Sequence, residues 1–216
     1  MENIYNKFIN LLELEDKENA VNMILNLLDE KKIDIVSLYT KILAPSLNNM
    51  KSDTAEGGVC IWKEHVRSSI IRTIIECCYP FVIKGKNELY EHTNFGKVII
   101  ICPPEEHHEI GARIISDFFT LCGYETIFVG GNTPKNEFLK VIDYVNPIYI
   151  VISVTSYYNL VAAKATIEKI RNSTTKKLYI LVGGHAFRNN PVAFKNSNAD
   201  MLIDNFDDIR NLKKEN

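Results

Sequence analysis

The chain has 216 residues, of which 46% are hydrophobic and 24% are charged, and its formal net charge is −2. This length allows one large domain or two small ones around a normal buried core. The balanced charge gives no nucleic-acid footprint, the apolar runs are too short to cross a membrane and the N-terminus lacks a signal peptide, so we expect a cytoplasmic protein that binds neither nucleic acid nor membrane.

Residues 1–83 are predicted to form a helical bundle. Apolar residues recur at spacings of three and four over residues 4–14, 20–28, 35–43 and 59–74, which is typical of four helices with short connections. Pro45 is expected to kink the third helix or to end it near Ala44. Gly57 and Gly58 separate this helix from the fourth.

Residues 84–95 are polar and contain Gly85, and we interpret them as a linker. Residues 96–216 then alternate short apolar runs with helical patterns, which predicts a Rossmann-like, flavodoxin-like domain with five parallel strands. The predicted strands cover residues 98–102, 126–129, 148–153, 178–182 and 201–203. The predicted fold class is therefore α/β, with an N-terminal four-helix bundle.

The five cysteines show no zinc spacing, and a bridge between the adjacent Cys77 and Cys78 would be strained. We interpret all five as reduced thiols, mostly in the core.

The loop after the first predicted strand carries no Gly-x-Gly-x-x-Gly motif, which disfavours dinucleotide binding. It contains Glu106, His108 and Gly111, at the edge of the sheet where open α/β sheets bind ligands. A histidine oriented by a carboxylate is suited to ligate a metal, so His108 is the candidate metal ligand. The alternative is a structural histidine.

Small and polar residues follow two other predicted strands. Ser153 and Thr155 come at the end of the third strand, and Gly183 and Gly184 at the end of the fourth. Ser153 could hydrogen-bond to Glu106 or His108, and the glycines would leave room for a flat group between strands. A helix cap and an ordinary turn are the alternatives.

Together these residues resemble the cobalamin-binding signature Asp-x-His-x-x-Gly, Ser-x-Leu, Gly-Gly of methionine synthase-type corrinoid domains. The resemblance implies that cobalamin binds with its own base displaced and with His108 below the cobalt. The nucleotide tail would then enter beside Ser153, Gly183 and Gly184. No catalytic residue of the chain itself is implied.

The resemblance extends to the bundle. Residues 57–68 are similar to the cap helix of this family, which implies that Glu64 and His65, with Ile61 and Trp62 beside them, face the upper side of the corrin. A solvated surface of a bundle helix is the alternative.

The sequence departs from the family's motifs at two places, and both bear on which subfamily it resembles. Glu106 in place of Asp, together with residues 130–134 and with Ser153 and Thr155, looks more like the cobalamin-dependent light sensors of MerR-type repressors and antirepressor-like proteins. Those sensors carry a Trp ten residues before the Glu-His pair, where this chain has Thr54. The upper ligand is therefore left open between methyl, water and adenosyl.

We expect a cobalamin-binding sensory or regulatory protein, responsive to light or redox state, that acts on a protein partner or through self-association. The alternative is a corrinoid carrier that shuttles methyl groups in a methyltransferase system. A degenerate domain that binds no corrinoid is the third interpretation.

Overall fold

A computed structural model describes residues 1–49, 61–91 and 93–212 of the chain. The chain divides into two compact units, Met1–Lys84 and Gly85–Asn216. The predicted boundary glycines Gly57 and Gly58, and Thr54, lie outside the described residues.

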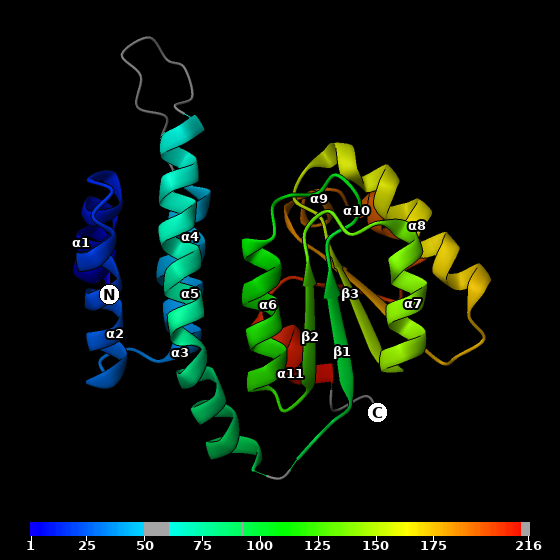
Figure 1. Cartoon of the computed structure of the whole chain (residues 1–216), viewed down its shortest axis with the longest axis horizontal. Helices are drawn as coiled ribbons and strands as arrows, with labels where there is room; N and C mark the ends of the chain where they lie inside the picture. Colours follow the sequence, from blue (N-terminus) through cyan, green and yellow to red (C-terminus); the bar gives the residue numbers. More distant parts are fainter. Residues whose placement is uncertain (50–60, 92, 213–216) are drawn as a thin grey trace. The chain divides into compact units, whose positions relative to one another are not determined.

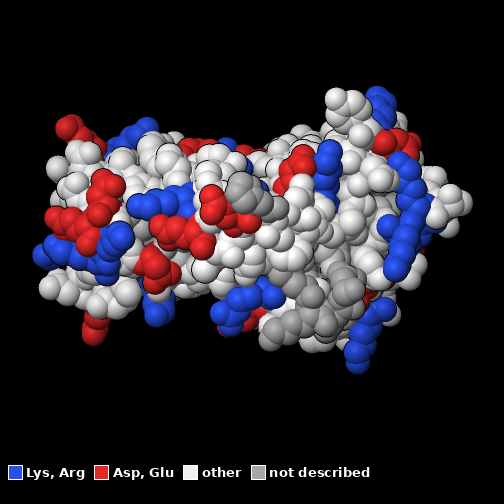
Figure 2. Space-filling model, turned by 90° about the horizontal axis from the view of Figure 1, so that it is seen from below, with Lys and Arg blue, Asp and Glu red and all other residues white. Residues whose placement is uncertain are grey.

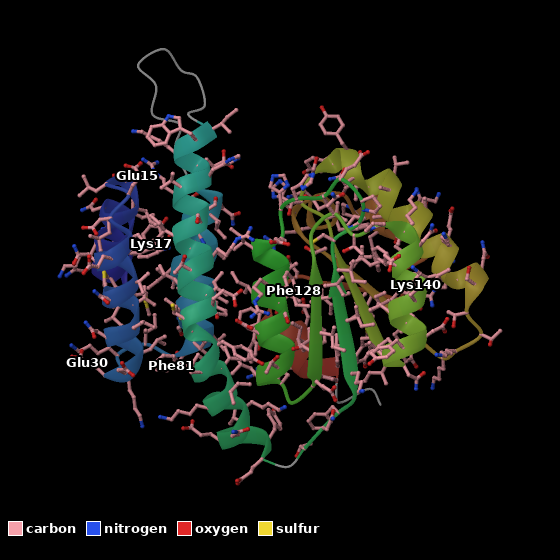
Figure 3. All side chains as sticks on the ribbon, viewed as in Figure 1. Glu15, Lys17, Glu30, Phe81, Phe128 and Lys140 are labelled. Atoms are coloured by element: carbon pink, nitrogen blue, oxygen red, sulfur yellow. The ribbon has the colours of Figure 1, made fainter. Side chains whose placement is uncertain are left out.

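The first unit is helical (Figure 1). Its described elements are α1 (Glu2–Glu13), α2 (Lys17–Asp29), α3 (Ile35–Leu38), the π-helix η1 (Tyr39–Leu43), α4 (Ala44–Asn48) and the first part of α5 (Ile61–Tyr90). Asp16 and Asp34 cap α2 and α3 by accepting hydrogen bonds from backbone N–H groups. Glu15, in the turn between α1 and α2 (Figure 3), forms an ion pair of 3.3 Å with the buried Arg67 of α5.

Pro45 does not end the third helical segment. The segment widens into the π-turn η1, in which Ala44 donates its N–H to the carbonyl of Tyr39, and then continues as α4. A proline cannot donate a backbone hydrogen bond, and it is tolerated in the first turn of a helix. Pro45 therefore sits at the start of a new helical turn.

The second unit is the predicted Rossmann-like domain. Five parallel strands lie in the order β2-β1-β3-β4-β5, as in flavodoxin-like folds. The strands are β1 (Lys97–Ile101), β2 (Glu125–Gly130), β3 (Tyr149–Ser153), β4 (Tyr179–Gly183) and β5 (Met201–Ile203). Each differs from its predicted range by at most one residue at either end.

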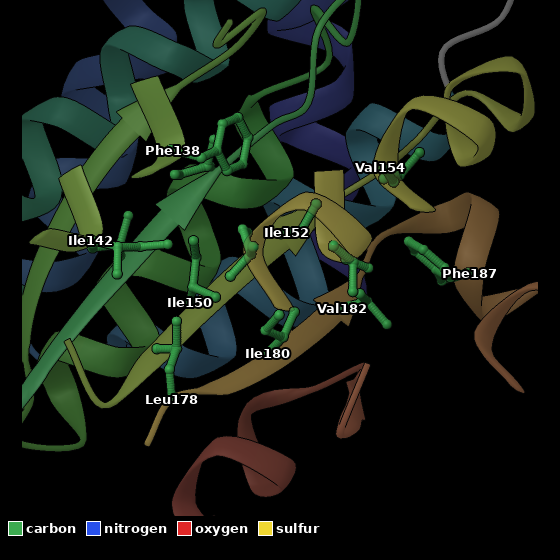
Figure 4. Packing of buried hydrophobic residues seen from close by; sticks show 14 of the residues in the cluster. Phe138, Ile142, Ile150, Ile152, Val154, Leu178, Ile180, Val182 and Phe187 are labelled. Carbon is green, nitrogen blue, oxygen red and sulfur yellow. The ribbon is translucent and has the colours of Figure 1, made fainter. Parts of the chain in front are cut away.

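Helices cover both faces of the sheet (Figure 1). They are α6 (Ile110–Leu121), α7 (Lys135–Val145), α8 (Leu160–Ser173), α9 (His185–Arg188), α10 (Pro191–Lys195) and α11 (Phe206–Asn211), with a 3₁₀ turn, η2 (Tyr157–Asn159), before α8. On one face, Phe138 and Ile142 of α7 cluster with Ile150 and Ile152 of β3 (Figure 4). Ile167 of α8 belongs to the same buried cluster. Such burial is the main stabilising term of the domain.

The range predicted as a linker is helical in its first half, because α5 continues to Tyr90. Gly85 lies inside this helix, and a Cβ atom there would come within 3.0 Å of Leu121 Cδ2. Close packing therefore accounts for this glycine, which is not a sign of a linker. The predicted limits of the two domains otherwise remain a prediction.

Acidic and basic side chains both occur across the face shown in Figure 2, in keeping with the small formal net charge. Within the described part of the chain, no helix combines the length and hydropathy that a membrane span requires.

Candidate functional site

Residues 102–109 connect β1 to α6 at the carboxyl edge of the sheet. β1 is flanked by β2 on one side and by β3 on the other, so this loop leaves the sheet where the chain changes direction. Open α/β sheets bind ligands at this position. The side chain of His108 is 62% exposed here, whereas that of Glu106 is fully buried.

The Glu106 carboxylate organises the site. One oxygen, Oε1, accepts hydrogen bonds from the backbone N–H of His108 at 3.0 Å and from His108 Nδ1 at 2.6 Å. The other, Oε2, accepts from the backbone N–H groups of Thr155 and Ser156, both at 2.9 Å, and from the Asn159 amide at 3.2 Å. The loops that follow β1 and β3 are thereby joined through one buried side chain.

Burial alone would raise the pKa of the Glu106 carboxyl, but hydrogen bonds from Ser156, His108 and Asn159 outweigh it and hold that pKa below its usual value. An ionised carboxylate only accepts hydrogen bonds, so His108 Nδ1 is the donor in this pair. The Nε2 atom of the neutral ring then keeps its lone pair. A histidine in this tautomer is prepared to bind a metal through Nε2.

Asn159 was missed by the sequence analysis. It ends the 3₁₀ turn before α8, is buried, and also donates to the Glu105 carbonyl at 3.3 Å. The available signal was a polar residue directly before the apolar stripe of α8, a position that suggests a helix cap. Its side chain forms no cap bond and turns to the β1–α6 loop instead.

Ser153 does not have its predicted contact. None of the hydrogen bonds among the described residues joins its hydroxyl to Glu106 or His108, and the residues that bind Glu106 come two to six positions later. Ser153 is the last residue of β3 and pairs with Gly183 of β4. It therefore lies in the strand, before the loop whose residues bind Glu106. Thr155 contributes to the site through its backbone N–H.

At Gly183 and Gly184, neighbouring backbone leaves no space for a side chain. A Cβ atom at Gly183 would lie 2.7 Å from the carbonyl oxygen of Ile203, and one at Gly184 would lie 2.4 Å from that of Val154. Gly184 also has a φ of +92°, which disfavours other residues. Close approach of backbone therefore accounts for both glycines, which allow β3, β4 and β5 to end close together. Their place beside the nucleotide tail remains a prediction.

Replacing Gly184 with alanine is expected to lower the free energy of unfolding by about 3 kcal/mol, because strained backbone and a steric clash add. Gly111→Ala is the matched control, since no described atom lies within 4 Å of a Cβ there. Urea unfolding of both variants measures the difference. Equal midpoints for the two variants would contradict this explanation of Gly184.

The remaining predicted site residues lie in the first unit. Ile61, Trp62, Glu64 and His65 occupy the first turns of α5 and are all exposed. Their predicted role at the upper face of the corrin remains a prediction.

Cys102 lies at the end of β1 and is fully buried. Burial raises the pKa of its thiol to about 12, and the nearby carboxylates of Glu106 and Glu109 contribute to the rise. The thiol therefore stays protonated at neutral pH and is suited neither to attack a substrate nor to ligate a metal as thiolate.

A hollow of about 690 Å³ opens between β2 and α7. Its lining includes Val129, Thr133, Lys140 and Tyr144, but none of the predicted site residues. Gly131 and Asn132 line the hollow and also form hydrogen bonds to the loop of residues 102–109, which carries His108.

The donor set fits a corrinoid. No three His, Cys, Asp or Glu side chains of the described residues gather to hold a metal ion. A single exposed imidazole with a carboxylate on its far nitrogen suits a metal that arrives with most of its ligands, as in a tetrapyrrole. Next to this loop, in the first turn of α6, a Cβ atom at Gly111 would meet no described atom within 4 Å.

Comparisons with known proteins agree with this fit. A family model described as B12 binding domain matches residues 96–207. A monomethylamine corrinoid protein from Methanosarcina barkeri superimposes with a TM-score of 0.80 at 12% identity, over 99% of this chain and 98% of that one. No curated protein matches the sequence.

Two further structures match with a TM-score of 0.49 and 16% identity each. One is a cobalamin-binding protein from Desulfitobacterium hafniense, and the match covers 97% of both chains. The other is a methanol:cobalamin methyltransferase complex from Methanosarcina barkeri, and the match covers 100% of this chain and 80% of that one.

Proposed function

Because the chain belongs to the B12-binding domain family, with cobalamin as its cofactor, we propose that it is a corrinoid carrier protein of a methyltransferase system. In this role His108 would hold cobalamin through its cobalt, and the bound cofactor would be presented to partner enzymes. The carrying observation is the pair formed by His108 Nδ1 and the buried Glu106 carboxylate at 2.6 Å, which leaves Nε2 for the metal.

Different residues of the chain would have different roles in holding the cofactor. His108 would bind the cobalt and fix the cofactor, while Glu106 would hold the imidazole in its tautomer and increase its basicity. Asn159 and the backbone of Thr155 and Ser156 would keep that carboxylate ionised. Bound cobalamin would supply a metal centre that takes a methyl group, as a cation equivalent, from one enzyme's substrate and yields it to a nucleophile on another.

The carrier, which the sequence analysis held as the alternative, is better supported than the sensor. The match to a corrinoid protein extends over nearly the whole chain, including the helical unit. The sensory interpretation rested on Glu106, residues 130–134, Ser153 and Thr155. Glu106 pairs with His108 Nδ1 as any carboxylate within reach could, so its presence in place of Asp gives no support to light sensing.

Spectroscopy on the loaded protein tests the proposal. The chain is incubated in darkness with methylcobalamin, freed of unbound ligand, and then mixed with a corrinoid-dependent methyltransferase and a thiol. We expect a stable spectrum until both are added, followed by a methylated thiol. A spectral change driven by light alone, with a change in oligomer size, would support the sensor instead. A colourless protein would contradict cobalamin binding.

A further inference from the structure

The loop of residues 102–109, called here the His108 loop, is bonded through Glu106 to the loop after β3. It also forms hydrogen bonds to the loop that connects β2 to α7. Asn132 donates its N–H to the Glu106 carbonyl at 2.8 Å, and its side chain accepts from the Glu105 N–H at 2.9 Å. Cys102 and Thr133 add two backbone hydrogen bonds between the same loops. The β2–α7 loop thus lies along the backbone that carries His108.

Glu109 closes this contact from the position next to His108. It is the N-cap residue of α6, but its carboxylate does not cap that helix. Its Oε2 atom instead accepts the N–H of Gly131 at 2.6 Å, across 22 positions of sequence. A short bond to a charged acceptor is among the stronger hydrogen bonds of a protein.

The glycines at 130 and 131 make this contact sterically feasible. A Cβ atom on Gly130 would lie 2.9 Å from Glu109 Oε2, and one on Gly131 would lie 3.1 Å from it. Gly131 would also meet the Glu106 carbonyl at 3.2 Å. Any larger residue would push the carboxylate away from the loop.

We propose that Glu109 is a positioning residue for His108. The two carboxylates hold opposite sides of the loop, Glu106 toward β3 and Glu109 toward β2, so that the exposed imidazole between them has little freedom to leave the metal. Preorganised ligands bind metals more tightly because less ordering remains to be done on binding. This inference rests on the proposed ligation of cobalt by His108.

The test compares Glu109→Ala and Glu109→Gln with Glu137→Ala, which removes an exposed carboxylate from the neighbouring helix α7. Each protein, with the heavy nitrogen isotope in its histidines only, is loaded with unlabelled cobalamin, reduced to the paramagnetic Co(II) form and examined by electron paramagnetic resonance for coupling to the labelled histidine nitrogen. Affinity for hydroxocobalamin is measured alongside. Hydrogen exchange at residues 130–133 is followed in the protein without corrinoid.

We expect Glu109→Ala to exchange faster in that loop, to bind cobalamin about 10-fold more weakly and to lose part of the nitrogen coupling. Glu109→Gln, whose amide oxygen can still accept from Gly131, should lie between Glu109→Ala and the wild type, and Glu137→Ala should match the wild type. If Glu109→Ala keeps the wild-type nitrogen coupling and the wild-type affinity for hydroxocobalamin, this inference alone is overturned. A wild-type protein without nitrogen coupling would overturn the proposed ligation, and this inference with it.

Discussion

Replacing His108 with alanine is expected to weaken cobalamin binding by about 10-fold or more while leaving the fold intact. The imidazole is the one side chain proposed to bind the metal, and even residues that only support a metal ligand change affinity by about 10- to 100-fold. Its side chain is 62% exposed but donates a hydrogen bond to the buried Glu106 carboxylate, so its loss should lower the free energy of unfolding by about 1.5 kcal/mol. Titration with hydroxocobalamin and urea unfolding measure the two effects.

His107→Ala is the matched control, since His107 is an exposed neighbour in the same loop. It should retain wild-type affinity and stability. If His108→Ala takes up cobalamin as tightly as His107→Ala does, the proposed binding of cobalt by His108 is wrong.

Replacing Glu106 with alanine is expected to affect both stability and binding. The change leaves five donors around a buried site without their acceptor, which should lower the free energy of unfolding by about 3 kcal/mol. It also frees the imidazole, so cobalamin affinity should fall by about 10- to 100-fold. Urea unfolding without ligand, followed by titration with hydroxocobalamin, measures both.

The stability loss should depend on pH with a defined sign. The folded state lowers the pKa of Glu106, so its contribution is fully present at neutral pH and is lost as the pH falls through the lowered pKa. The difference between Glu106→Ala and wild type should therefore shrink in acid. Glu105→Ala, a change at an exposed side chain of the same loop, serves as control. A Glu106→Ala variant as stable as Glu105→Ala at neutral pH would contradict the account of this carboxylate.

The strands and their edge could be predicted from the sequence because local patterns determine them. Runs such as residues 98–102 are short, apolar and rich in Val and Ile, and parallel strands place their carboxyl ends along one edge. The identity of His108 and Glu106 as a pair followed from that placement and from their spacing.

The contacts that complete the site depend on how loops pack, which no local pattern shows. Asn159 and Glu109 each occupy a position that suggests a helix cap, yet both side chains bond to a different loop. The helical course of residues 84–90 was missed for a similar reason. Gly85 is disfavoured in helices by its intrinsic propensity, and packing against Leu121 accounts for it.

The most direct test of the account uses protein in which only the histidines carry the heavy nitrogen isotope. Loaded with unlabelled cobalamin and reduced to Co(II), this protein should show an electron paramagnetic resonance spectrum whose nitrogen coupling differs from that of unlabelled protein, and His108→Ala should abolish the difference. A coupling unchanged by the label would mean that the cofactor keeps its own base on the cobalt, which would contradict the proposed ligation.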